Sequence, residues 1–88
     1  MQQISKINGV YTLPTNKKVT KSFIINALRL ERANGLNYCI IEFTNGKMFK
    51  VTFANLGYEL ENMENSELLV CGNFDIEVLL HSINFFKK

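Results

Sequence analysis

The sequence is poor in the residues that build most catalytic and metal sites. It has one histidine, His81, and two cysteines, Cys39 and Cys71, which show no C-x-x-C spacing. Zinc sites and cysteine–histidine catalytic pairs need such residues in defined groups, so we expect no metal and no cofactor. The five glycines are dispersed and form neither glycine-rich motif that cradles phosphates. The chain is therefore predicted not to be an enzyme.

Long apolar runs are also missing. No stretch approaches the roughly 20 apolar residues of a membrane span, and the start, MQQISKINGV, lacks the apolar core of a secretory signal. We therefore predict a cytoplasmic protein without a membrane partner. Both cysteines fall in apolar stretches and are predicted to be buried free thiols, because cytosolic disulfides are rare. His81 lies beside an apolar stripe and is predicted to be partly buried and structural.

The composition that remains is that of one small globular domain. The chain has 88 residues, of which 47% are hydrophobic, and we expect a single domain over 1–88. Asparagine and lysine are frequent and arginine is scarce. This bias is typical of AT-rich genomes such as those of phages and low-GC bacteria.

The first half of the chain predicts an extended segment followed by a helix. Residues 3–7 and 10–13 surround Asn8-Gly9 and form either a short hairpin or one bent strand, which Pro14 ends. Thr20 is the expected N-cap of a helix through Ala33, and Asn34-Gly35 is its expected end. The predicted buried stripe of this helix contains Phe23, Ile24, Ala27, Leu28 and Leu30.

A central hairpin is predicted around Asn45-Gly46 in FTNGKMF, with strands over 37–43 and 48–53. A two-residue loop pairs Phe43 with Met48 and Cys39 with Thr52. The more apolar face is then the predicted core face, with Tyr38, Ile40, Phe49, Val51 and Phe53. If both helices cover that face, the other face, with Cys39, Ile41, Phe43 and Met48, stays open as an interaction patch.

The second half of the chain predicts a further hairpin and a final helix. Residues 58–63 and 67–71 pair around Asn65-Ser66, with a short helix over 55–63 as the alternative. Asn73 is the expected cap of a helix over 74–86. The sequence thus predicts an α+β fold, a small antiparallel sheet of about three to five strands with two helices, in the order β-α-β-β-β(β)-α.

Charge is segregated along the chain, although the net charge is only +2. The glutamates concentrate in ELENMENSE, which is predicted to protect a sheet edge against strand addition. The first helix carries a basic face with one apolar side chain in it, which is either a solvated surface or a contact for an acidic partner or phosphates. The predicted partner-binding residues are Lys17, Lys18, Lys21, Ile25, Arg29 and Arg32.

The final helix has two apolar stripes and therefore needs two neighbours. One stripe faces the sheet. The other contains Phe74, Val78 and Phe85, which we predict to mediate self-association as a homodimer. Together these features predict a small protein-binding module that acts as a regulator or inhibitor of the kind phages encode. The alternative is a nucleic-acid-binding protein that uses the basic helix face.

Overall fold

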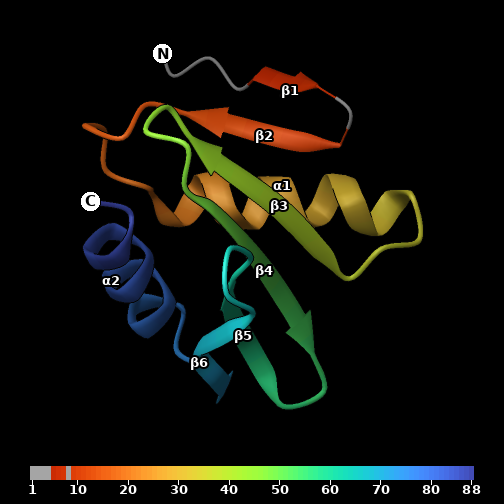
Figure 1. Ribbon diagram of the computed structural model, residues 1–88. Helices are drawn as coiled ribbons and strands as arrows, with labels where there is room; N and C mark the ends of the chain where they lie inside the picture. Colours follow the sequence, from red (N-terminus) through yellow and green to blue (C-terminus); the bar gives the residue numbers. More distant parts are fainter. Residues whose placement is uncertain (1–4, 8) are drawn as a thin grey trace.

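The computed structural model describes residues 5–7 and 9–88 and shows a six-stranded sheet with two helices on one face (Figure 1). The α+β class and the predicted order of elements are confirmed. The strands follow the chain order across the sheet. They are β1 (Ser5–Ile7), β2 (Val10–Leu13), β3 (Tyr38–Phe43), β4 (Met48–Ala54), β5 (Gly57–Asn62) and β6 (Glu67–Asn73); the helices are α1 (Lys21–Ala33) and α2 (Ile76–Phe86).

The sheet has one strand more than predicted and is mixed. Strands β2 and β3 pair in parallel, whereas all other neighbours are antiparallel. A parallel pair needs a crossover connection, and α1 supplies it. The N-terminal segment forms a β1–β2 hairpin, and Asn8 of its predicted turn lies outside the described residues.

The ends of α1 are those that the sequence predicts. The Thr20 hydroxyl accepts a hydrogen bond from the Phe23 N–H at 3.2 Å. At the other end, the Gly35 N–H donates to the Arg32 carbonyl at 2.9 Å, just after Asn34. Both ends depend on local residues, which explains why sequence patterns find them.

The buried face of α1 differs from the prediction at one position. Leu30 was expected in the core but is 55% exposed. The neighbouring Glu31 is buried instead, and its carboxylate accepts a hydrogen bond from the Tyr11 hydroxyl of β2 at 2.7 Å. A buried carboxylate requires such a donor, so this contact fixes the rotation of α1 about its axis.

The β3–β4 hairpin has a three-residue loop rather than the predicted two-residue loop. The Phe43 N–H donates to the Lys47 carbonyl, and the Gly46 N–H donates to the Phe43 carbonyl, both at 2.8 Å. Gly46 has a φ of 94°, in the left-handed region that glycine favours. A turn followed by a left-handed glycine is the usual geometry of a three-residue hairpin loop.

This loop shifts the pairing by one residue, which moves the side chains of one strand to the opposite face. Cys39 pairs with Val51, and Ile41 pairs with Phe49. The prediction that Cys39, Ile41 and Phe43 lie on the open face is therefore wrong. They are buried under the helices with Phe49 and Val51.

The face away from the helices carries side chains that were assigned to the core. Tyr38 and Ile40 lie there and are half-buried, together with Met48 and Lys50. The Lys50 Nζ is 4.5 Å from the centroid of the Tyr38 ring, which is a cation–π contact. Lys50 also pairs in register with Glu61 of β5. This face is consequently of mixed polarity and is not the apolar patch that the sequence suggested.

Residues 57–73 form the predicted second hairpin, and the alternative of a short helix over 55–63 is wrong. The glutamate-rich stretch lies in β5, in its turn and at the start of β6, which is an edge strand. Helix α2 begins later than predicted. Its N-cap is Asp75, which accepts from the Glu77 N–H at 3.0 Å, and not Asn73. Asn73 instead accepts from the Asp75 N–H at 2.8 Å in the preceding turn.

The β3–β4 loop connects distant parts of the chain. The Thr44 N–H donates to the Leu13 carbonyl at 3.0 Å. The Asn45 N–H donates to the Thr15 hydroxyl at 3.0 Å, and its side-chain amide donates to the Lys87 carbonyl at 2.6 Å. The end of β2 and the end of α2 are thereby held at the same loop.

Two predictions about single polar residues are wrong. Cys39 is buried as expected, but Cys71 is exposed. His81 is exposed and not part of the core. Among the described residues, neither helix is long and apolar enough to cross a membrane.

The Tyr11–Glu31 contact predicts how stability changes at alkaline pH. Burial raises the pKa of Tyr11 above its ordinary value of about 10, and the hydrogen bond to Glu31 and the charge of that carboxylate raise it further. The contribution of the protonated phenol to stability is complete below about pH 10 and is lost as the pH rises towards the native pKa.

We expect Tyr11→Phe to lower the free energy of unfolding by about 1–3 kcal/mol at neutral pH, because a buried carboxylate loses a donor. The difference from wild type should shrink above about pH 10, since phenylalanine cannot ionise. Denaturant unfolding at several pH values measures this, with Tyr38→Phe on the half-buried open face as control. A difference that does not change with pH would contradict it.

Candidate functional site

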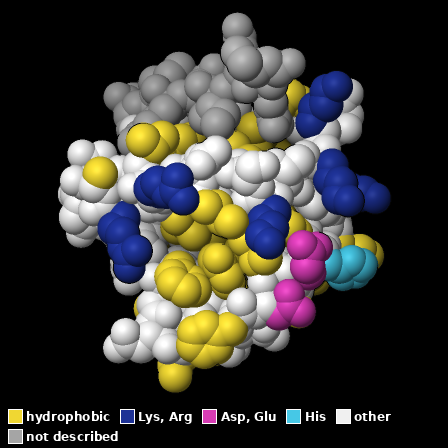
Figure 2. Space-filling view, turned by 180° about the vertical axis from the view of Figure 1, so that it is seen from behind, with side chains coloured by type: hydrophobic (Ala, Val, Ile, Leu, Met, Phe, Trp, Pro, Cys, Tyr) yellow, Lys and Arg dark blue, Asp and Glu magenta, His cyan; other side chains and the backbone are white. Residues whose placement is uncertain are grey.

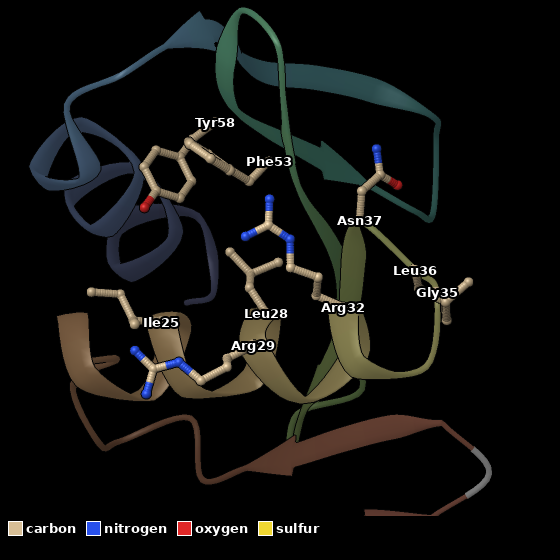
Figure 3. A pocket seen from close by; sticks show the side chains of 9 residues that line it. All are labelled: Ile25, Leu28, Arg29, Arg32, Gly35, Leu36, Asn37, Phe53 and Tyr58. Carbon is tan, nitrogen blue, oxygen red and sulfur yellow. The ribbon is translucent and has the colours of Figure 1, made fainter.

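An open cavity of about 430 Å³ lies between α1 and the sheet (Figure 3). Helix α1, the loop that follows it, and strands β4 and β5 form its walls. We call it the α1 cleft. Its lining residues are Ile25, Leu28, Arg29, Arg32, Gly35, Leu36, Asn37, Phe53 and Tyr58.

The floor of the α1 cleft is aromatic because the helices leave part of β4 uncovered. Helix α1 packs mainly on β3, and α2 packs on β5 and β6. Phe49 and Val51 of β4 are buried, but Phe53 further along the strand is 37% exposed. Phe53 pairs in register with Tyr58, and the two ring centroids are 4.6 Å apart. The result is an aromatic pair that is partly open to solvent.

Two arginines stand on one wall of the α1 cleft. Arg29 and Arg32 are three residues apart on α1 and therefore share one side of the helix. In Figure 3, Arg32 extends towards Phe53, while Arg29 extends along the helix towards Ile25. Figure 2 shows this face of the molecule, with hydrophobic side chains at the centre, Lys and Arg side chains around most of them, and Asp or Glu side chains and the histidine at the right edge. No carboxylate of the described residues forms an ion pair with either guanidinium, and none lines the cleft.

The structure divides the predicted partner-binding residues between two places. Ile25, Arg29 and Arg32 come together in the α1 cleft. Lys18 and Lys21 line a second cavity of about 520 Å³ between the start of α1 and α2. Lys17 is exposed, and its carbonyl accepts a hydrogen bond from the Lys87 ammonium.

Sequence analysis missed the other half of the α1 cleft. Phe53 was assigned to the core, and Tyr58 was given no role. Both lie on strands that are distant from α1 in the sequence, so no local pattern joins them to Arg29 and Arg32. The helical spacing of Arg29 and Arg32 identifies their side of α1 from sequence. The opposite wall, formed by β4 and β5, depends on tertiary structure.

The two helices meet at one end and separate from there (Figure 1). The side chain of Asn84 in α2 holds this junction. Its carbonyl oxygen accepts from the Val19 N–H at 2.8 Å, and its amide donates to the Val19 carbonyl at 3.1 Å and to the Leu80 carbonyl at 2.9 Å. The start of α1 is thereby fixed against the last turn of α2.

Of the predicted self-association residues, Val78 and Phe85 lie on the outer side of α2, whereas Phe74 precedes the helix, which begins at Ile76. Phe74 is 67% exposed, Val78 is 38% exposed and Phe85 is 65% exposed. The ring of Phe85 packs edge to face on Phe86, with the centroids 5.0 Å apart. Such a row of exposed apolar side chains is more typical of an interface than of a solvated helix face.

The described residues contain no group of three or more His, Cys, Asp or Glu side chains that could hold a metal ion. Comparison with known proteins adds no further constraint, because no protein family, curated protein or solved structure matches the chain. The function is therefore argued from the surfaces of the molecule.

The junction at Asn84 gives a prediction about stability. Asn84→Ala should lower the free energy of unfolding by about 1–3 kcal/mol, because the N–H and carbonyl of Val19 lose their partner in a partly buried place. Chemical denaturation followed by circular dichroism measures the change. Asn26→Ala, on the exposed side of α1, is the matched control and should change stability by less than about 0.5 kcal/mol. Equal stability of Asn84→Ala and wild type would show that another contact holds the junction.

Proposed function

We propose that this chain is a small non-enzymatic protein that binds another protein through the α1 cleft. The observation that carries the proposal is the combination of a partly exposed apolar floor with two arginines that have no ion-pair partner among the described residues. Phe53 and Tyr58 provide apolar area, and Arg29 and Arg32 provide charge that no carboxylate of the described residues neutralises. Aromatic residues and arginine are enriched in the energetically dominant parts of protein interfaces.

The small size and the composition support a role as a regulator or inhibitor of a host protein, of the kind that phages and mobile elements encode. Such a protein acts by occupying a surface, so it needs no catalytic group of its own. The exposed free thiol of Cys71 supports action in the reducing cytoplasm.

Reversing the charge of the cleft wall tests the proposal. The double variant Arg29→Glu/Arg32→Glu should weaken the partner complex about tenfold or more, because carboxylates of the partner would then face carboxylates. Both residues are exposed, so the fold should persist by circular dichroism. The measurement is affinity capture from lysate of the source cells with quantitative mass spectrometry.

The matched control is Lys17→Glu/Lys18→Glu, which makes the same change in net charge outside the α1 cleft. A true cleft partner is retained by wild type and by this control and is lost from Arg29→Glu/Arg32→Glu. If wild type, the control and Arg29→Glu/Arg32→Glu all capture a partner equally, the two arginines do not contact that partner and are merely solvated.

Nucleic-acid binding is the second candidate, favoured by the exposure of Lys17, Lys18, Lys21, Arg29 and Arg32. A titration with mixed-sequence duplex and single-stranded DNA at two salt concentrations separates the candidates. Binding through phosphates weakens steeply with salt, because counterions are released. Tight binding of this kind would favour the second candidate over a protein partner.

We further propose that the outer side of α2, with Val78 and Phe85, mediates self-association together with Phe74 just before the helix. Phe85→Ser should shift wild-type homodimers to monomers in analytical ultracentrifugation, since it removes the largest exposed apolar group near the end of α2. Phe85 is 65% exposed, so the free energy of unfolding should change by less than about 0.5 kcal/mol.

Leu30→Ser is the matched control, because Leu30 is similarly exposed, at 55%, but lies on α1. It should leave the oligomeric state unchanged. Wild-type protein that sediments as a monomer at all concentrations would refute the homodimer.

A further inference from the structure

The α1 cleft has the position that a third helix would take on this sheet. Neighbouring helices lie about 8–10 Å apart and strands about 4.8 Å apart, so a helix beside α1 covers strands about two places further along. Helix α1 packs mainly on β3. The next two strands after β3 are β4 and β5, and at their adjoining ends Phe53 and Tyr58 form the pair that is partly open to solvent.

The backbone around the α1 cleft favours a helix over an extended segment. The Phe53 N–H donates to the Asn37 carbonyl at 3.0 Å, and the Leu36 N–H donates to the Glu31 carbonyl at 2.9 Å. Strands β4 and β5 are paired up to Ala54 and Gly57. These lining groups are thus already satisfied and offer no strand edge. An extended segment would bury its own unpaired polar groups there, whereas a helix satisfies them internally.

The charge of the cleft specifies the chemistry of the occupant. Arg29 and Arg32 have no carboxylate partner among the described residues, and the rest of the lining is uncharged. Acidic side chains three or four residues apart on a helix lie on one side and would face both arginines. Ile25 and Arg32 are about 10 Å apart along the axis of α1, so the occupant needs at least about two turns.

From these observations we infer that the α1 cleft binds an acidic amphipathic α-helix of another protein, which packs beside α1. Its apolar side chains contact Phe53 and Tyr58, and its carboxylates pair with Arg29 and Arg32. The inference rests on the proposed protein-binding function and adds the conformation and the charge of the partner segment.

A peptide-selection experiment tests this with a defined probe. Phage-displayed random peptides of about 15 residues, long enough for four helical turns, are selected on wild type and depleted on Arg29→Glu/Arg32→Glu. The enriched peptides should carry apolar residues at spacings of three and four, with Asp or Glu beside them. Synthetic copies should gain helical circular dichroism on binding. Their Kd should rise about tenfold or more for Arg29→Glu/Arg32→Glu and stay unchanged for Lys17→Glu/Lys18→Glu.

A second variant tests the apolar contact independently of charge. Phe53→Ser removes half of the aromatic floor and should weaken the same peptides about tenfold. A proline in the middle of the peptide should weaken binding about a hundredfold, because it breaks the helix. Equal affinity of the proline peptide would refute the helical occupant.

Other outcomes separate this inference from the proposed function. Peptides that alternate with a period of two, or that are basic, would overturn the acidic helix and leave protein binding through the cleft in place. If no selected peptide binds wild type more tightly than Arg29→Glu/Arg32→Glu, the acidic helix and protein binding through the α1 cleft are both refuted. Loss of single-stranded DNA binding in that variant would then assign the cleft to nucleic acid, and loss of self-association would assign it to a second copy.

Discussion

The register of the β3–β4 hairpin is the constraint on which the rest of this structure depends. Its three-residue loop places Ile41 opposite Phe49 and turns both towards the helices. A shift by one residue would send half of these side chains to the other face. The same loop holds the end of α2 through the hydrogen bond from Asn45 to the Lys87 carbonyl. Register and helix position are therefore set together, and both helices cover a single face.

Two helices on one face of a six-stranded sheet leave the α1 cleft. Helix α1 contributes both to the core and to the wall of the cleft in this arrangement. Inward, Glu31 and its bond to Tyr11 fix the rotation of the helix. That rotation directs Arg29 and Arg32 to the cleft. Arg29 is two residues before Glu31 and Arg32 is one residue after it, and residues so spaced point to different sides of a helix. A structural contact in the core thus determines the charge on the wall of the α1 cleft.

The outer side of α2 and the α1 cleft are separate surfaces, because the residues exposed on α2 do not line the cleft. Self-association through Phe85 would therefore leave both clefts of a dimer accessible. A dimer with two clefts can bind two segments of one partner, which raises the effective affinity without any new contact. The Asn84 junction links the two surfaces, since it fixes α1 against the helix that would form the dimer.

By itself the sequence determined the features that depend on neighbouring residues: the start of α1 at Thr20, its end at Asn34-Gly35, the order of elements and the basic side of α1. The hairpin register was beyond it, because Asn-Gly suits loops of two and of three residues and apolar side chains occur on both faces of β3. Contacts between residues distant in the sequence decide between the two loop lengths. Tertiary structure alone brought Phe53 and Tyr58 to Arg29 and Arg32, since the cleft exists where two distant helices fail to cover the sheet.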